Sequence, residues 1–298
     1  MIVITAPTGN IGRHLLARLL ESAPAAGERL RVIVRDPARL PDAAHGGRVE
    51  VVAGSHADAE VLDRAFEGAD AVFWLVPPDA SLPPHETYSG FTRPAVEALV
   101  THGVGHVVCV SALGRGTPLA DRAGLVTATL AMDDLIAGTG VAHRALAGAS
   151  FFENLLEECD AIRDRGVFTD TVDPDRKAPF VAAADIAAAA ERLLLDRSWA
   201  GTGSVPLLGP QDLSPCDLAH IMTEQLGRPV RYERQSLDEL HTTLVGHGLN
   251  EEFVQGIVDM KRAKDEGLDA GVLRTPDTTC ATGFAQWCAD TLLPAVRA

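Results

Sequence analysis

The chain opens with the stretch IVITAPTGNIG, residues 2–12, which decides the fold. Four residues typical of a buried strand lead into a turn that contains Gly9 and Gly12, and an amphipathic helix follows. Apolar residues recur along this helix at helical spacing, at Ile11, Leu15, Leu16 and Leu19. A second apolar strand, residues 30–34, then ends on Arg35. This order is typical of the start of a dinucleotide-binding domain, and a strand-turn-helix without a ligand is the alternative.

The turn has the chemistry that a diphosphate requires. The first amides of a helix are free to donate hydrogen bonds, and the helix dipole makes that end positive. Gly9 lets the backbone approach the phosphates, and Gly12 lets the helix pack closely on the first strand. The pattern is A-x-x-G-x-x-G, because Ala6 stands where the full fingerprint has another glycine.

Arg35 indicates which dinucleotide is bound. A carboxylate at the end of the second strand selects NAD, because it bonds the ribose hydroxyls and repels a 2′-phosphate. A guanidinium there can bind that phosphate through charge-assisted hydrogen bonds. Successive side chains on a strand point opposite ways, so Asp36 need not face the ribose, and Arg39 is a second candidate cation. The sequence favours NADP(H), and a solvated pair of Arg35 and Asp36 is the alternative.

Composition limits the class of protein. The 298 residues are 46% hydrophobic and 22% charged, which is typical of a soluble protein that can bury a large core. The net charge of -15 disfavours nucleic-acid binding and requires local donors for an anionic cofactor. No stretch has the roughly 20 apolar residues of a membrane span, and no export leader is recognisable. Five cysteines without paired spacing predict a reduced, cytoplasmic protein with no metal site.

Strand and helix patterns alternate through the first half, which predicts an α/β fold with a doubly wound parallel sheet. Strands are expected at residues 2–5, 30–34, 49–52, 71–76, 106–111 and 141–146, and helices at 58–66, 92–102 and 125–137. In the second half we expect an Ala-rich helix capped by Asp185, a strand at 205–208, a helix capped by Ser214, and a strand at 228–232. This predicts a nucleotide-binding domain over 1–150 and a smaller α+β lobe over 151–298. A segment near 180–210 should return to the first sheet.

The chain resembles the NmrA-like group of atypical short-chain dehydrogenase/reductases over its whole length. The stretches that carry the resemblance are 4–12, 34–37, 68–73, 110–114 and 150–154, and later 226–230. It implies a Rossmann domain that binds NADP(H) and a C-terminal lobe that forms one wall of a substrate cleft. Carried over by position, the cofactor-binding residues are Thr8, Gly9, Asn10, Ile11, Gly12, Arg35, Leu75, Val76, Pro77, Ser111, Gly148 and Phe151.

In three places the chain departs from the family pattern. Ala6 replaces the usual glycine, and Ala147-Gly148-Ala149 stands where Arg-Pro-Gly is common. Ser55 replaces a frequent acidic residue after the third strand, which weakens an adenine contact there.

The proton donor is not evident from the sequence. Ketone reduction in this superfamily usually relies on a Tyr and a Lys four residues apart. The only tyrosines are Tyr88 and Tyr232, and the lysines are Lys177, Lys261 and Lys264, so this pair is absent. The weak catalytic candidates are Ser111, which could instead make a strand-end hydrogen bond, and His85, which could be a solvated loop residue. Structural roles are expected for His143 and Glu153, and Asn154 is a weak candidate for a substrate contact.

The leading functional hypothesis is an NADPH-dependent oxidoreductase that reduces a small apolar electrophile such as a quinone, imine, enone or carbonyl. The rival is a regulatory protein that senses NADP(H) without turnover, which a missing proton donor would permit. An isomerase or lyase that keeps the cofactor as a structural element is a third possibility. The expected partner is a small-molecule substrate, with no membrane and no nucleic acid, and the protein is a monomer or homodimer.

Overall fold

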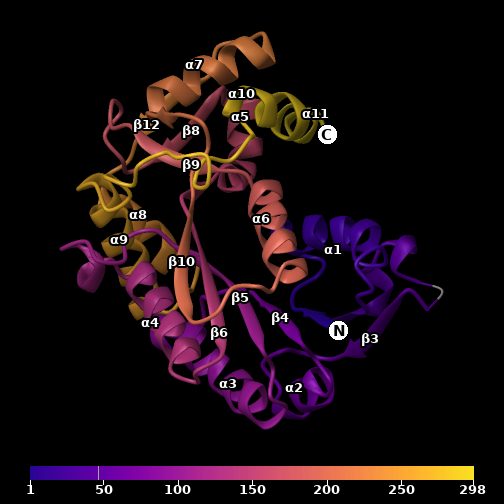
Figure 1. Cartoon of the computed structure of the whole chain (residues 1–298). Helices are drawn as coiled ribbons and strands as arrows, with labels where there is room; N and C mark the ends of the chain where they lie inside the picture. The colour runs from indigo at the N-terminus through magenta and orange to yellow at the C-terminus, as the bar shows by residue number, and fades with distance from the viewer. Residues whose placement is uncertain (46) are drawn as a thin grey trace.

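The computed structural model describes residues 1–45 and 47–298, and its centre is a seven-stranded sheet in which all neighbouring strands are parallel. The strand order is β10-β6-β5-β4-β1-β2-β3 (Figure 1). The strands are β1 (Ile2–Ile4), β2 (Leu30–Val34), β3 (Val49–Ala53), β4 (Ala71–Trp74), β5 (His106–Ala112), β6 (Ala142–Gly148) and β10 (Thr202–Leu207). The sheet grows in both directions from β1, so the predicted doubly wound fold is confirmed.

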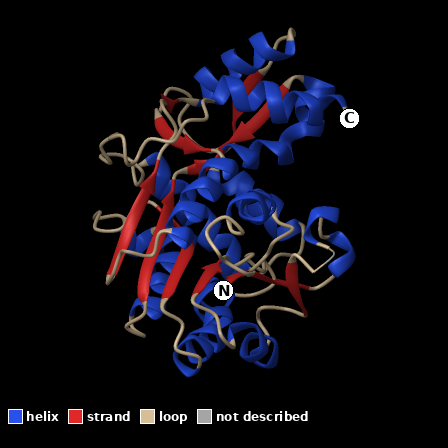
Figure 2. Cartoon of the chain, turned by 45° about the vertical axis from the view of Figure 1, so that its right-hand side comes forward, coloured by secondary structure: helices blue, strands red, loops and turns tan. Residues whose placement is uncertain are grey.

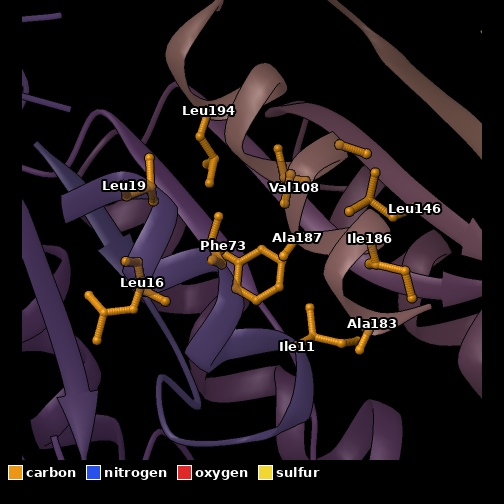
Figure 3. Packing of buried hydrophobic residues seen from close by; sticks show 14 of the residues in the cluster. Ile11, Leu16, Leu19, Phe73, Val108, Leu146, Ala183, Ile186, Ala187 and Leu194 are labelled. Carbon is orange, nitrogen blue, oxygen red and sulfur yellow. The ribbon is translucent and has the colours of Figure 1, made fainter. Parts of the chain in front are cut away.

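Two layers of helices cover the two faces of this sheet. They are α1 (Asn10–Ser22) and α6 (Ala183–Leu195) on one face, and α2 (Ala59–Phe66), α3 (Phe91–Thr101) and α4 (Leu125–Ala137) on the other. Alternation along β1 divides the core, because Ile2 and Ile4 face α1 and α6 whereas Val3 faces α2 and α3. Figure 3 shows Phe73 and Val108 lying between the side chains of α1 and α6.

A smaller second lobe lies beyond the carboxyl ends of the strands, and Figure 2 draws it above the sheet with the C-terminus in it. Its strands are β7 (Ser150–Phe151), β8 (Val167–Asp170), β9 (Ala178–Val181), β11 (Asp212–Leu213) and β12 (Arg231–Arg234). Its helices are α5 (Cys159–Arg165), α7 (Pro215–Leu226), α8 (Leu237–Gly246), α9 (Glu251–Asp265), α10 (Phe284–Trp287) and α11 (Leu293–Arg297). Phe152 packs against Phe180, Phe284 and Trp287 in its core. None of the described helices is both long enough and apolar enough to cross a membrane.

The two lobes are connected through the backbone as well as through side chains. The chain leaves the sheet after β6, returns through α6 and β10, and enters the second lobe again at β11. Helix α9 also packs directly on the start of α4, where a Cβ on Gly124 would lie 1.9 Å from the carbonyl oxygen of Gly256. Gly124 has a positive φ of 54°, so this contact requires glycine for two reasons.

Three predictions about elements need correction. Asp185 does not cap α6, because Ala182 holds that position and the Asp185 carboxylate accepts a hydrogen bond from the Thr282 amide. The strand expected at 228–232 begins at Arg231, because the Val230 amide donates to the Thr223 hydroxyl instead of to a strand carbonyl. Strand β4 ends at Trp74, because the Leu75 amide donates to the hydroxyl of Thr5 instead of to a strand carbonyl.

Ala6 has a φ of 47° and is the one non-glycine residue with positive φ in the described chain. This left-handed conformation places the Cβ of an L-residue too close to its own carbonyl oxygen. A glycine at this position, as in the full fingerprint, would adopt the same backbone without that repulsion. The turn after β1 therefore contains stored backbone strain.

Replacing Ala6 with glycine should raise the free energy of unfolding by about 0.5–1 kcal/mol, because relief of roughly 1–2 kcal/mol of strain exceeds the entropic cost of the glycine. Urea unfolding at constant pH measures this change. The matched control is Ala25→Gly, at an exposed turn position with negative φ, which should lower stability. Equal losses of stability in the two variants would contradict this explanation.

Candidate active site

A cavity of about 540 Å³ lies at the carboxyl ends of β1, β4, β5 and β6, beneath the second lobe. Its size is in the range of ordinary small-molecule sites. It lies at the switch point of the sheet, where β1 separates the two halves. The nucleotide-binding half contributes Ala6, Gly9, Asn10, Ile11, Leu75, Val76, Pro77 and Pro78. The opposite side is formed by Tyr88, Val110, Ser111, Ala112, Leu125, Val126, Thr129, Met132, Gly148, Ala149, Ser150, Phe151, Asn154, Met260, Lys261 and Lys264.

The turn after β1 is shaped to receive a phosphate group. No side chain in the described structure caps the N-terminus of α1, so its first amides remain available to a ligand. A Cβ on Gly12 would lie 2.0 Å from the Ala6 carbonyl oxygen, so only glycine allows α1 to start here. Thr5 fixes the turn, because its hydroxyl donates to the Phe73 carbonyl at 3.0 Å and accepts from the Leu75 amide at 2.9 Å. These features fit the diphosphate of a dinucleotide.

The predicted cofactor residues fall into two groups. Gly9, Asn10 and Ile11 line the cavity, as do Leu75, Val76, Pro77, Ser111, Gly148 and Phe151. Gly12 is buried under the turn, Thr8 is half-buried beside it, and Arg35 is exposed at the end of β2, so these three lie outside the cavity wall.

Arg35 lies at the strand end that faces the adenosine part of a dinucleotide in this fold. The Asp36 carboxylate makes a local contact, because it accepts a hydrogen bond from the Ala38 amide at 3.1 Å. Arg39 lies in the same short turn and is exposed. Burial lowers the pKa of the neighbouring His56 to about 4, and the charge of Arg35 contributes to this shift. Arg35 and Arg39 thus place two exposed guanidinium groups at the end of β2.

Ser111 is 5% exposed at the end of β5, and its hydroxyl donates to the Asp133 carboxylate at 2.6 Å. The Cys109 thiol donates to the other oxygen of Asp133 at 3.2 Å, and His143 Nε2 lies 2.9 Å from Cys109 Sγ. Because its proton points to Asp133, Ser111 presents lone pairs to the cavity. It is thus an acceptor for a ligand amide or hydroxyl, which argues against Ser111 as a proton donor.

Cys109, Asp133 and His143 bring three potential metal ligands within 4.8 Å of one another. Burial, reinforced by the charge of Asp133, raises the pKa of the Cys109 thiol well above its usual value. A metal site requires the deprotonated thiolate. The raised pKa favours the protonated thiol, whose S–H group donates a hydrogen bond to Asp133. The three side chains form a hydrogen-bond network, and the absence of a metal site stays a prediction.

The remaining candidates differ in their access to the cavity. His85 is 65% exposed, pairs with Glu86 and lies outside the cavity wall. Tyr88, from the π-helical turn Glu86–Gly90, lines the cavity, and burial raises the pKa of its hydroxyl. Glu153 is buried and binds the Ala183 amide and the Trp287 indole, each at 3.0 Å, whereas Asn154 reaches the cavity.

Sequence reasoning missed Asp133 and the cavity lysines. Asp133 lies in the apolar helix α4, and the burial of its carboxylate is what distinguishes it from an ordinary surface residue. Lys261 and Lys264 come from α9, more than 100 residues after the strand ends that they face. Lys261 Nζ lies 2.8 and 2.9 Å from the two oxygens of Asp170. Lys264 Nζ lies 2.5 Å from Asp269 and 3.2 Å from the Ser150 hydroxyl.

The parallel sheet, the glycine turn and the cavity at the switch point define a Rossmann-type nucleotide-binding protein. Residues 7–151 match the family described as NAD(P)H-binding. The chain is 30% identical over 246 residues to (4-alkanoyl-5-oxo-2,5-dihydrofuran-3-yl)methyl phosphate reductase of Streptomyces griseus, covering 82% of this chain and 80% of that one. It is 27% identical over 276 residues to quinone oxidoreductase 2 of Escherichia coli, covering 92% and 90%.

Among solved structures, triphenylmethane reductase of Citrobacter sp. complexed with NADP(H) superposes with a TM-score of 0.79 at 21% identity, covering 99% of this chain and 100% of that one. The chain belongs to this NAD(P)H-binding family, which agrees with the family resemblance seen in the sequence. It is accordingly classed with the NAD(P)H-dependent oxidoreductases.

The buried histidines should make stability depend on pH. Burial lowers the pKa of His143 to about 4, against about 6.5 in an unfolded chain. The unfolded state therefore binds more protons below pH 6.5, and stability is lost as the pH falls toward 4. Between pH 7 and pH 5, His143 should cost about 2 kcal/mol of unfolding free energy. His143→Gln should remove that part of the loss in urea titrations at the two pH values.

Exposed His85 gives the control, since His85→Gln should leave the pH dependence unchanged. If His143→Gln and the unaltered chain lose the same stability on acidification, the assignment to His143 is wrong.

Proposed function

We propose that this protein is an NADPH-dependent reductase of a small, mainly apolar electrophile such as a quinone, imine, enone or carbonyl compound. The observation that carries the proposal is the cavity, which places the phosphate-binding turn and a largely apolar wall at the switch point of one sheet. Two relatives support this class of substrate, since one is named a quinone oxidoreductase and the other a reductase of an oxo-dihydrofuran phosphate.

In the proposed complex, Thr8 to Gly12 bind the diphosphate and Arg35 binds the 2′-phosphate. Leu75 to Pro77 contact the adenosine and its ribose, and the segment Gly148–Phe151 flanks the nicotinamide. When bound, the reduced cofactor supplies a hydride to the electrophile. The Ser111 hydroxyl, held by Asp133, accepts a hydrogen bond from the carboxamide and so orients the ring.

The reduced substrate also needs a proton. Ser111 directs its own proton to Asp133, and His85 is outside the cavity wall. The Tyr88 hydroxyl is the cavity's phenolic donor, and its raised pKa makes it a stable hydrogen-bond donor to a developing oxyanion. Water can then supply the proton, which suits acceptors such as quinones whose reduced form is a weak base.

The proposal also divides the chain by role. Residues 1–150, with the returning segment near 180–210, form the nucleotide-binding domain. Residues 151–298 form the lobe that closes the substrate side, where Asn154, Met260 and α9 reach the cavity.

Arg35→Ala should raise the KM for NADPH by about 10- to 100-fold, because roughly 1.5–3 kcal/mol of charge-assisted hydrogen bonding to the 2′-phosphate is lost. The KM for NADH should change by less than about 2-fold, since NADH has no such phosphate. Arg39→Ala is the matched control on the neighbouring turn and should have the smaller effect. An unchanged preference between the two cofactors in Arg35→Ala would refute the role of Arg35.

The purified protein should oxidise NADPH, followed by absorbance at 340 nm, with at least one acceptor from a panel of quinones, enones, imines and aldehydes. Calorimetric titration with NADPH and with NADP⁺ is the companion measurement. Cofactor binding without turnover on any acceptor would contradict the reductase and favour an NADP(H)-sensing protein. Absence of binding would contradict both.

A further inference from the structure

The cavity has an unusual charge for this chain. Its charged lining consists of Lys261 and Lys264, with no acidic side chain in the described lining, although the protein has a net charge of -15. These are two of only three lysines in the sequence. The remainder of the wall is apolar or neutral, so the charged groups that reach the cavity surface are both cationic, and each is paired with a carboxylate outside the lining.

Both ammonium groups are oriented by carboxylates that stand behind them. Asp170 and Asp269 bind Lys261 and Lys264, and neither carboxylate lines the cavity. An ammonium group has three N–H donors, and Asp269 and Ser150 engage two of those on Lys264. Both lysines thus keep donor capacity toward the cavity, and their conformations are fixed before a ligand arrives.

The position of α9 is fixed as well. The Gly124–Gly256 contact brings the backbone of α9 against the start of α4. Met260 of α9 packs against the apolar cluster that contains Val126 and Leu130 of α4. Lys261 and Lys264 are separated by one helical turn, so they project from adjacent positions on one face.

The phosphates of the cofactor have donors elsewhere. The diphosphate has the N-terminus of α1, and the 2′-phosphate has Arg35. Figure 1 draws α9 beside α4, on the side of the molecule away from α1. The lysines therefore face the part of the cavity that is left for the substrate.

We infer that the substrate of the proposed reductase carries a small oxyanion such as a phosphate monoester, which Lys261 and Lys264 bind while the apolar electrophilic part lies against the nicotinamide. This inference rests on the proposed function and adds a substrate class to it. The oxyanion serves in binding alone and does not take part in the hydride transfer.

The test compares two acceptors that differ only in the anion, 2-(hydroxymethyl)-1,4-naphthoquinone and its phosphate monoester. In NADPH oxidation assays the phosphate should have a KM at least about 10-fold below that of the alcohol, as expected for one or two charge-assisted hydrogen bonds. Lys261→Gln should abolish most of this difference by raising the KM for the phosphate toward that of the alcohol. Lys261→Arg should retain the preference.

Lys177→Gln is the matched control, because Lys177 is an exposed lysine of the second lobe that pairs with Asp217. Lys264 is tested in the double variant Lys264→Gln/Asp269→Asn, which leaves no buried carboxylate unpaired. Equal KM values for the two acceptors in the unaltered protein would overturn the inference. The inference would also be overturned if the lysine variants raised the KM for NADPH and left the KM for the quinone phosphate unchanged, because the lysines would then bind the cofactor.

If neither quinone is reduced, the full acceptor panel decides the proposed function, and binding tests the oxyanion site separately. The phosphate monoester is titrated calorimetrically into protein saturated with NADP⁺. Heat in the unaltered protein that disappears in Lys261→Gln supports the site, whereas no heat overturns it.

Discussion

The contact between the Ala6 carbonyl and Gly12 is the constraint on which the site depends. A Cβ at residue 12 would lie 2.0 Å from that oxygen, and Ala6 accepts a left-handed backbone to make the turn. This turn aims the free amides of α1 at the switch point. It also places α1 against α6, whose continuation supplies the outer strand β10. Backbone strain at one residue is therefore balanced by packing across the whole face of the sheet.

Several contacts between the two lobes hold the second lobe in the position where it completes the cavity. The chain passes between the lobes several times, and Glu153 joins the segment after β7 to the start of α6 and to Trp287. The glycine contact between α4 and α9 adds a further fixed point. The cavity is thus formed by both lobes, so the first half of the chain predicts only part of its wall.

The sequence predicted those features that depend on local pattern. The β1-α1-β2 unit follows from spacing within 35 residues, and Ser214 caps α7 with Pro215 at its first position, as expected. Asp185 was misassigned because its partner, Thr282, is 97 residues away. Asp133, Lys261 and Lys264 carry no motif, and only the packing of α4 and α9 brings them to the strand ends. Long-range contacts of this kind leave no periodic trace in a single sequence.

The direction of one hydrogen bond constrains the chemistry of the site. Asp133 is buried, and burial raises its pKa, yet the carboxylate accepts hydrogen bonds from Ser111 and Cys109 and lies near Arg115. These contacts favour its charged form, so a proton on Ser111 is held away from the cavity. In the function proposed above, Ser111 would orient the nicotinamide, and a phenol or water would supply the proton. Such an arrangement suits electrophiles that accept hydride without strong acid catalysis, and the chain contains no Tyr and Lys four residues apart.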